Sequence, residues 1–189
     1  EGNIRFKNSR HTWRDGRCVY CGASEEELGR DDTHESYAYE FIHIDDVRKE
    51  LPMKFDVIIG NPPYQLNDGG NGASASPIYQ KFVEQAKKLN PRYLIMITPS
   101  RWFSGGKGLT SFRKDMLSDR RIRKMVDFIN AKDCFPQNSV GGGVNYFLWD
   151  RDHEGDCEIT TVLGQKRDTM TRPLDEFPSF VRYNQAVSI

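Results

Sequence analysis

The chain of 189 residues is 37% hydrophobic, 29% charged and 12% aromatic, and its 27 Lys and Arg balance 27 Asp and Glu. This is the composition of a soluble globular protein long enough for one domain with a full core, and no stretch approaches the roughly 18–20 apolar residues of a membrane span. The four cysteines form no secreted disulfide framework and no secretory signal opens the chain, so we expect a protein of the reducing cytosol.

Residues 1–36 are polar, without sustained periodicity, and we interpret them as an insertion. Their RCVYCG segment carries Cys18-x-x-Cys21, one half of a zinc-knuckle pattern. A tetrahedral site needs two further ligands, and the histidines available sit at no diagnostic spacing: His11, His34 and His43. We favour two reduced thiols in a loop over a zinc site, and assign no metal ligand.

The next segments predict alternating strands and helices. Residues 37–45, rich in aromatic and β-branched side chains, predict a strand that ends at Asp45. Residues 55–59 form an apolar run typical of a strand buried on both faces. A loop of small and polar residues at 65–76 leads to a predicted helix over 77–89. Its expected inward face comprises Ile78, Phe82, Val83 and Ala86.

Further strands are predicted at 93–99, 122–129 and 144–150, with an amphipathic helix over 109–119 and a short edge strand at 158–163. The helix should bury Leu109, Phe112, Met116 and Leu117. The order β–β–α–β–α–β–β predicts an α/β fold, namely part of a doubly wound, mostly parallel sheet. The loop between 122–129 and 144–150 is too short for a helical crossover, so these strands should form an antiparallel pair.

The strand at 55–59 ends in Asn61-Pro62-Pro63-Tyr64. The two prolines fix φ and remove two N–H groups, so the chain forms a stiff turn where open α/β sheets place ligand chemistry. The Asn61 amide oxygen and the Pro62 carbonyl offer two acceptors for a planar –NH₂ group, and Tyr64 offers a stacking face. Accepting both amine hydrogens localises the nitrogen lone pair for attack on an electrophile.

This turn resembles the catalytic motif of S-adenosylmethionine-dependent amino-methyltransferases, chiefly DNA adenine-N6 methylases. The segments YAYEFIHIDD, FDVIIGNPPYQL, SPIYQKFVEQA, LIMITPSRWFSGGKG and CFPQNSVGGGVNYFLWDRD are similar to the methylase domain of restriction–modification enzymes. The resemblance covers roughly two-thirds of the chain and implies a Rossmann-like class I methyltransferase sheet over 37–163.

The resemblance implies roles for individual residues. Asn61 and Pro62 would accept the amine hydrogens of a flipped adenine, within the Asn61–Tyr64 catalytic motif, and Tyr64 would stack on the base. Phe135, in CFPQ, would pack on its other side, or is an ordinary core aromatic. Asp45 would hold the adenine moiety of the cofactor, or is a simple acid at a strand end.

One part of the family pattern is missing from the sequence. The Gly-rich cofactor loop after a first strand is absent, and we interpret the glycine clusters at 69–72, 105–108 and 141–143 as loops near DNA or as turns. We therefore expect an excised C-terminal part of a catalytic domain, with an incomplete S-adenosylmethionine site and no activity by itself. Residues 164–189 would be a linker toward an absent target-recognition domain.

The resemblance implies double-stranded DNA as the substrate of the parent enzyme, a restriction or specificity subunit or domain as a partner, and a bacterial or archaeal cytoplasm. Residues 81–124 contain twelve Lys and Arg but only three acids. This excess of positive charge is typical of a surface that binds a polyanion, or of a solvated helix surface. Alternatives are methyltransferases of ribosomal RNA guanine, release-factor glutamine or DNA cytosine N4, and a non-enzymatic DNA-binding remnant.

Overall fold

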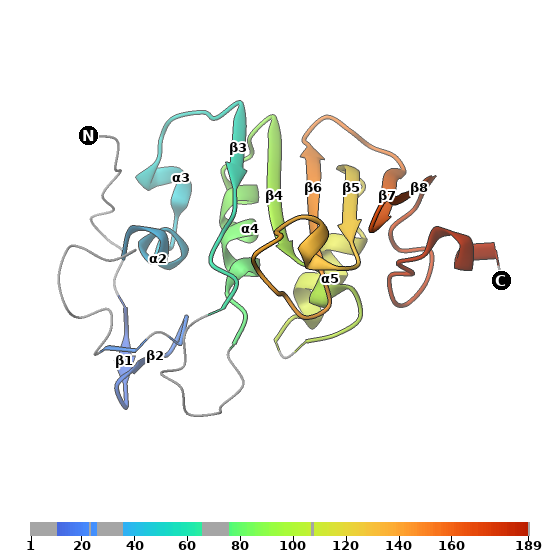
Figure 1. Ribbon diagram of the computed structural model, residues 1–189. Helices are drawn as coiled ribbons and strands as arrows, with labels where there is room; N and C mark the ends of the chain where they lie inside the picture. Colours follow the sequence, from blue (N-terminus) through green and yellow to red (C-terminus); the bar gives the residue numbers. More distant parts are fainter. Residues whose placement is uncertain (1–10, 23, 26–35, 66–75, 107, 189) are drawn as a thin grey trace. The chain divides into compact units, whose positions relative to one another are not determined.

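The computed structural model describes residues 11–22, 24–25, 36–65, 76–106 and 108–188 (Figure 1). The chain divides into two compact units. One comprises the described residues of Glu1–Lys54 and Pro62–Asn90, and the other those of Phe55–Asn61 and Pro91–Ile189. Within the described ranges, no helix has the length and apolar character needed to cross a membrane.

The described part of the first unit contains a hairpin and the helices α2, α3 and α4. Strands β1 (Trp13–Arg14) and β2 (Arg17–Cys18) pair antiparallel. Asp15 and Gly16 between them both have positive φ, 52° and 72°, as a two-residue hairpin turn of type I′ requires. The helices are α2 (Ser36–His43), α3 (Val47–Glu50) and α4 (Tyr79–Lys88).

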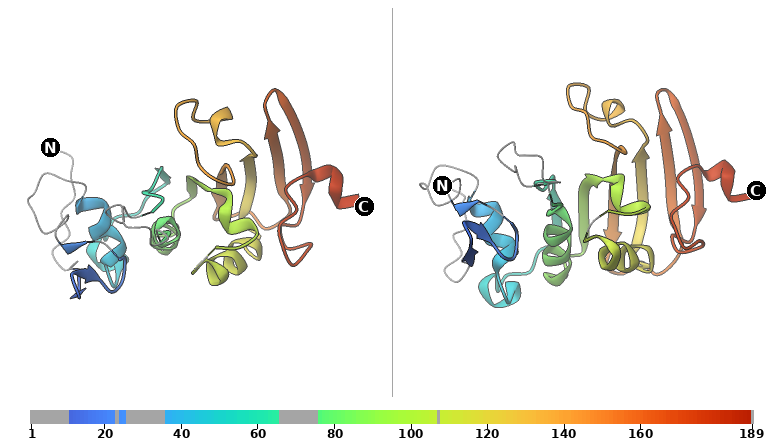
Figure 2. Two further views of the ribbon diagram at one scale, coloured as in Figure 1. Left: turned by 60° about the horizontal axis from the view of Figure 1, so that its bottom comes forward. Right: turned by 90° about the horizontal axis from the view of Figure 1, so that it is seen from below.

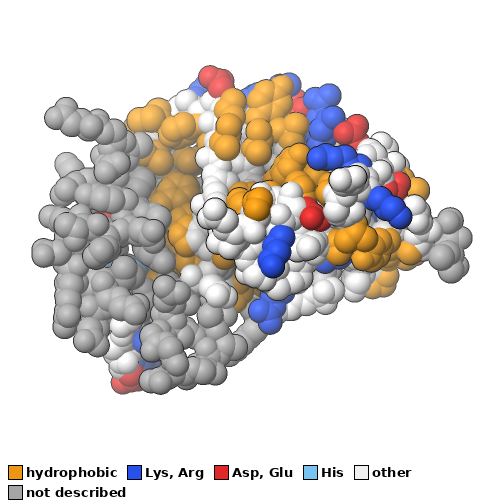
Figure 3. Space-filling model, viewed as in Figure 1, with side chains coloured by type: hydrophobic (Ala, Val, Ile, Leu, Met, Phe, Trp, Pro, Cys, Tyr) orange, Lys and Arg blue, Asp and Glu red, His pale blue; other side chains and the backbone are white. Residues whose placement is uncertain are grey.

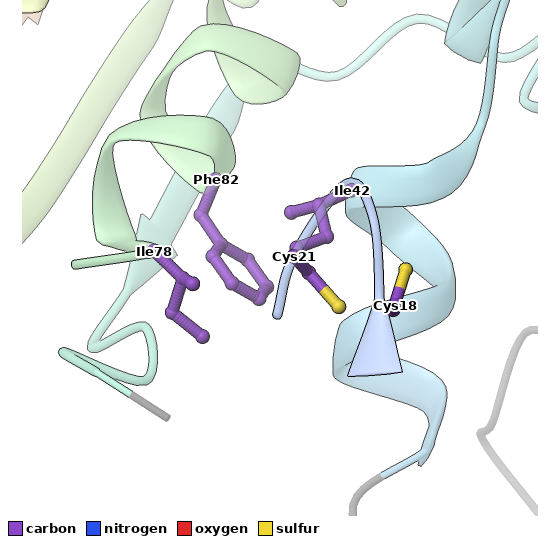
Figure 4. Packing of buried hydrophobic residues seen from close by; sticks show 5 residues of the cluster. All are labelled: Cys18, Cys21, Ile42, Ile78 and Phe82. Atoms are coloured by element: carbon purple, nitrogen blue, oxygen red, sulfur yellow. The ribbon is translucent and has the colours of Figure 1, made fainter. Parts of the chain in front are cut away.

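The strand predicted at 37–45 is wrong, because these residues form helix α2. Ile42 of α2 is 1% exposed and belongs to one hydrophobic cluster with Ile78 and Phe82, at the start of and within α4 (Figure 4). Gln85 of α4 donates from Nε2 to the carbonyl oxygens of Phe41 (3.0 Å) and Ile44 (2.8 Å). These carbonyls lie at the end of α2, where the helix has no N–H group left to bind them. These contacts with a distant helix outweigh the strand-favouring composition.

Helix α4 confirms the helix predicted over 77–89, and its expected inward face is buried. The exposed fractions of these side chains are between 0% and 6%: Ile78, Phe82, Val83 and Ala86. Asn90 follows the helix with φ of 52°, which ends it before Pro91.

The second unit is built on a six-stranded sheet in the order β3-β4-β6-β5-β7-β8. Its strands are β3 (Val57–Gly60), β4 (Tyr93–Pro99), β5 (Ile122–Phe128), β6 (Val144–Asp150), β7 (Cys157–Leu163) and β8 (Lys166–Arg172). The predicted antiparallel pair of β5 with β6 is confirmed.

The expectation of a mostly parallel sheet is wrong, because the sheet is mixed. β3 with β4 and β5 with β7 are parallel, whereas β4 with β6, β5 with β6, and β7 with β8 are antiparallel. The physical reason is that β6 returns between β4 and β5 and runs against both. The chain is therefore an α/β fold with a mixed sheet.

Helix α5 (Thr110–Leu117) packs on this sheet, and Figure 2 shows it on one side with the β5–β6 loop on the other. The side chains predicted to face inward are all buried, with exposed fractions from 0% to 7%: Leu109, Phe112, Met116 and Leu117. Three short 3₁₀ helices complete the unit, η1 (Ser100–Phe103), η2 (Ala131–Asp133) and η3 (Asn184–Ser188).

Strand β3 is confirmed close to the predicted position, but its expected burial on both faces is wrong. β3 lies at one edge of the sheet, and Val57 and Ile59 are 47% and 72% exposed. An apolar run alone does not distinguish a central strand from an edge strand, because the strand order is set by pairing between distant segments.

Candidate functional site

Asn61 lies directly beyond the carboxyl end of β3, where its side chain is exposed. β3 pairs in parallel register with β4, Gly60 opposite Met96, which fixes the level at which the strand ends. The amide of Asn61 is therefore presented to solvent from the end of a paired strand, as the sequence predicts.

Pro62, Pro63 and Tyr64 belong to the other compact unit. Pro62 is buried, and the next two residues are half-buried. The Tyr64 carbonyl accepts a hydrogen bond from the Ile78 N–H at 3.2 Å, and the Tyr64 ring meets the Tyr79 ring edge-on, with centroids 6.5 Å apart. These contacts hold the aromatic residue of the motif against the start of α4.

Phe135 lies in the loop between β5 and β6 and is half-buried. Its N–H donates to the Ala131 carbonyl at 2.7 Å, and its own carbonyl accepts from the Asn138 N–H at 3.0 Å, so the backbone forms successive turns here. β3 is parallel to β4, and β6 is antiparallel to both β4 and β5. The carboxyl ends of β3 and β5 consequently lie at the same end of the sheet (Figure 1). Asn61 directly follows β3, and the loop of Phe135 follows β5.

A buried polar network connects the strands at this end of the sheet. Asp127 of β5 is fully buried and accepts hydrogen bonds from the Ser100 hydroxyl at 2.7 Å and from Arg182, through Nε at 2.7 Å and Nη2 at 2.8 Å. Asn145 of β6, also fully buried, donates to the Thr98 carbonyl at 3.2 Å. The network binds the ends of β4, β5 and β6 to the C-terminal segment.

The end of the β5–β6 loop is fixed by the same arginine. Arg182 Nη1 donates to the Gly142 carbonyl at 2.7 Å. Gly143 follows with φ of 84°, and a Cβ there would lie 2.1 Å from the Phe128 carbonyl oxygen. Only glycine allows the backbone to approach this closely. Asp127 and Arg182 were not predicted as functional residues, although an acid within the apolar strand 122–129 is a signal in the sequence.

Asp45 does not occupy the place predicted for it. It is exposed in the bend after helix α2, so the strand end that motivated its cofactor role is absent. Of the glycine clusters, 69–72 lies outside the described residues, 105–106 and 108 follow η1, and 141–143 precede β6. Neither Asp45 nor the described glycine clusters therefore lie where the family pattern places a cofactor loop.

The structure brings two histidines to the Cys-x-x-Cys pair. The Cys18 sulfur lies 3.3 Å from His43 Nε2, and the Cys21 sulfur lies 3.5 Å from His11 Nδ1. Burial raises the pKa of the Cys18 thiol, but hydrogen bonds from the backbone of Cys21 and Tyr20 and from both histidine rings outweigh it and lower the pKa to about 5. Both cysteines are unbridged thiols, as predicted, and the structure adds a histidine ring beside each sulfur.

The sequence model of the family described as Eco57I restriction-modification methylase matches residues 1–135. An "uncharacterized adenine-specific methylase" of Mycoplasma pneumoniae is 38% identical over 162 residues, covering 79% of this chain and 38% of that protein. The chain thus spans 38% of the length of this curated relative.

Two solved structures resemble the chain at low sequence identity. A modification subunit of a putative type I restriction enzyme from Vibrio vulnificus has 14% identity and a TM-score of 0.42, covering 64% of this chain and 28% of its own. A type I methyltransferase subunit from Streptococcus thermophilus has 13% identity and a TM-score of 0.44, covering 72% and 31%. Because the family's sequence model matches well over half of the residues, the protein belongs to the Eco57I restriction-modification methylase family.

Proposed function

We propose that the protein is a DNA methyltransferase of a restriction–modification system, which transfers a methyl group to the N6 amino group of adenine. Family membership and the adenine-specific methylase relative support this reaction class. The observation that carries the proposal is the exposed amide of Asn61 at the carboxyl end of β3, followed directly by two prolines.

The role proposed for the motif is to accept both hydrogens of an adenine amine. The Asn61 side-chain oxygen and the Pro62 carbonyl oxygen are hydrogen-bond acceptors. Neither Pro62 nor Pro63 has a backbone N–H that could bind to them in place of the amine. Two such bonds would draw the amine nitrogen toward tetrahedral geometry and concentrate its lone pair for attack on a sulfonium methyl group, whose bond to sulfur would break as the C–N bond forms and leave a thioether. The departing proton leaves from the nitrogen, and no carboxylate is required to remove it first.

An adenine amine is inaccessible inside a duplex, so the proposal includes extrusion of the base from the stack. Tyr64 would stack on one face of the extruded ring and Phe135 on the other. The location of the Phe135 loop at the same end of the sheet as Asn61 supports this assignment. The network around Asp127 would act by positioning that loop.

S-adenosylmethionine is the methyl donor implied by the family, and double-stranded DNA is the proposed substrate. Figure 3 shows Lys and Arg side chains interspersed with acidic and apolar ones on the face seen there. We propose that the six-stranded sheet of the second unit is a Rossmann-like class I methyltransferase sheet and that residues 1–36 are an insertion. The linker expected at 164–189 is wrong, because β8 pairs with β7 and Arg182 binds Asp127. A restriction or specificity subunit would be the protein partner, in a bacterial or archaeal cytoplasm.

The test uses the full-length gene product with labelled S-adenosylmethionine and duplex DNA. Analysis of the digested DNA should find N6-methyladenine, and neither N4-methylcytosine nor methylated protein. Asn61→Ala should lower kcat at least about 100-fold, as expected when a transition-state hydrogen bond is removed. Asn61→Asp, which retains an acceptor oxygen, should keep more activity than Asn61→Ala.

Gln165→Ala provides the control, because Gln165 is an exposed amide side chain in the turn between β7 and β8 of the same unit. Its kcat should equal that of the unchanged protein. Full turnover by Asn61→Ala would refute the acceptor role, whereas methylcytosine or methylglutamine as the product would refute the substrate assignment while leaving that role intact.

A further inference from the structure

Four ligand-type side chains of the first unit converge on one point: His11, Cys18, Cys21 and His43. One ligand atom from each lies within 4.8 Å of all the others. With Zn–S bonds of about 2.3 Å and Zn–N bonds of about 2.0–2.1 Å, a tetrahedral zinc ion holds its ligand atoms about 3.3–3.8 Å apart. The two sulfur–nitrogen distances, 3.3 and 3.5 Å, are close to that spacing.

Local backbone structure prepares the two sulfurs for a metal. Cys18 ends strand β2 of the hairpin, and the Gly22 N–H donates to the Cys18 carbonyl at 2.8 Å, closing a tight turn over the pair. Gly22 has φ of 80°, a conformation natural to glycine. Both cysteines are 2–3% exposed, and Figure 4 shows them beside Ile42 of α2.

The histidines come from both sides of this turn. His11 precedes the hairpin, and His43 is the last residue of α2. Their rings meet edge-on with centroids 4.3 Å apart, while His11 also stacks on Trp13 at 4.7 Å and His43 meets the Tyr20 ring at 5.2 Å. Aromatic neighbours on each ring restrict its rotation, which keeps a nitrogen directed toward the sulfurs.

We propose that His11, Cys18, Cys21 and His43 bind one zinc ion in a structural site. Two thiolates neutralise the charge of the ion, and two soft sulfur and two imidazole donors in a tetrahedral arrangement select zinc over magnesium or calcium. All four positions are taken by protein, so the ion has no open position for a substrate. Its effect is to tie the β1–β2 hairpin to the end of α2.

The ion stabilises a unit with a small apolar cluster of its own. The buried members of that cluster include both cysteines, together with Ile42, Ile78 and Phe82. Small apolar clusters of this kind are commonly supplemented by a metal or a disulfide. A disulfide between Cys18 and Cys21 is the competing arrangement, but the two cysteines are not bridged. A disulfide would also leave the convergence of the two histidines unexplained.

The test is metal analysis of the purified full-length gene product, expressed with added zinc. We expect one zinc per chain, and X-ray absorption at the zinc edge should show two sulfur and two nitrogen neighbours. Cys21→Ser and His43→Asn should each lose most of the metal. The matched controls, Cys134→Ser and His153→Asn, lie in the other unit and should retain it.

A second measurement does not depend on the folding of the variants. Cobalt(II) added to the metal-stripped, otherwise unchanged protein should give visible bands of tetrahedral cobalt and a thiolate-to-cobalt charge-transfer band. Absence of both zinc and these bands would overturn the proposal, as would full zinc occupancy in Cys21→Ser. Metal content is read without any methylation assay, so this inference and the proposed function fail independently.

Discussion

Arg182 and Asp127 form a bidentate ion pair across the sheet end, with Nε and Nη2 donating to the two carboxylate oxygens at 2.7 and 2.8 Å. The carboxylate is fully buried and the arginine side chain is 23% exposed. Removing one partner of such a pair leaves an uncompensated charge in the interior, which costs far more than the pair itself contributes.

We therefore expect Arg182→Met to lower the free energy of unfolding by about 3–5 kcal/mol. The control is Lys124→Met, on strand β5 with Asp127, which breaks the exposed ion pair of Lys124 with Glu158 at 2.8 Å. It should lower the free energy of unfolding by about 0–1 kcal/mol. Urea titrations followed by circular dichroism measure both. Equal losses in the two variants would show that burial of Asp127 does not determine the cost.

Gly143 offers a test of backbone strain next to that pair. Alanine there would combine φ of 84° with a Cβ 2.1 Å from the Phe128 carbonyl oxygen, so the loop must shift. Gly143→Ala should lower the free energy of unfolding by at least about 2 kcal/mol. Gly141→Ala, where a Cβ meets nothing within 4 Å, should change it by less than about 0.5 kcal/mol. A Gly143→Ala protein as stable as Gly141→Ala would contradict this geometry.

Gln85 provides the donor for two carbonyls at the end of α2. Gln85→Leu keeps the bulk of the side chain but leaves the Phe41 and Ile44 carbonyls without this donor, at a cost of about 1–3 kcal/mol. Amide hydrogen exchange of α2 should accelerate. The exposed Lys88 of the same helix is the control, and Lys88→Leu should leave exchange in α2 unchanged.

Cys157 should be chemically inert in the folded protein. Burial raises the pKa of its thiol to about 12, so the reactive thiolate is scarce below that pH, and the side chain is 2% exposed. Iodoacetamide at about pH 8, near the ordinary thiol pKa, should label the half-exposed Cys134 and spare Cys157, as read by peptide mass spectrometry. Comparable labelling of both under native conditions would exclude the packed environment.

The raised pKa of Cys157 also makes the stability of the fold depend on pH. Because the pKa of Cys157 in the folded protein lies above its ordinary value of 9.0, the thiol form contributes stability that is fully present below about pH 9 and lost as pH rises toward 12.

Much of the fold was predictable because it depends on local periodicity. β4 and β6 were predicted at their observed bounds, and α4 and α5 bury the faces expected of them. The position of β6 between β4 and β5 was not predictable, since it arises from pairing of segments far apart in the chain. β8 was missed because it is charged and largely exposed, although Gly164 at the turn, with φ of 59°, is a hairpin signal.

The candidate site residues were likewise predictable only where they depend on local sequence. The position of Asn61 after a strand was readable, because strand and turn are contiguous in the sequence. The convergence of His43 on Cys18 was not, because it depends on α2 being a helix, and its aromatic composition favours a strand.

The two edge strands of the sheet differ in charge, and this difference affects the solubility of the protein. The edge formed by β8 carries the charges of Lys166, Arg167 and Asp168, which discourage strand-to-strand association. The edge formed by β3 carries no charge and exposes Val57 and Ile59. Exposed apolar residues on an edge strand favour intermolecular β-pairing, so Ile59→Lys should improve the solubility of preparations of these 189 residues.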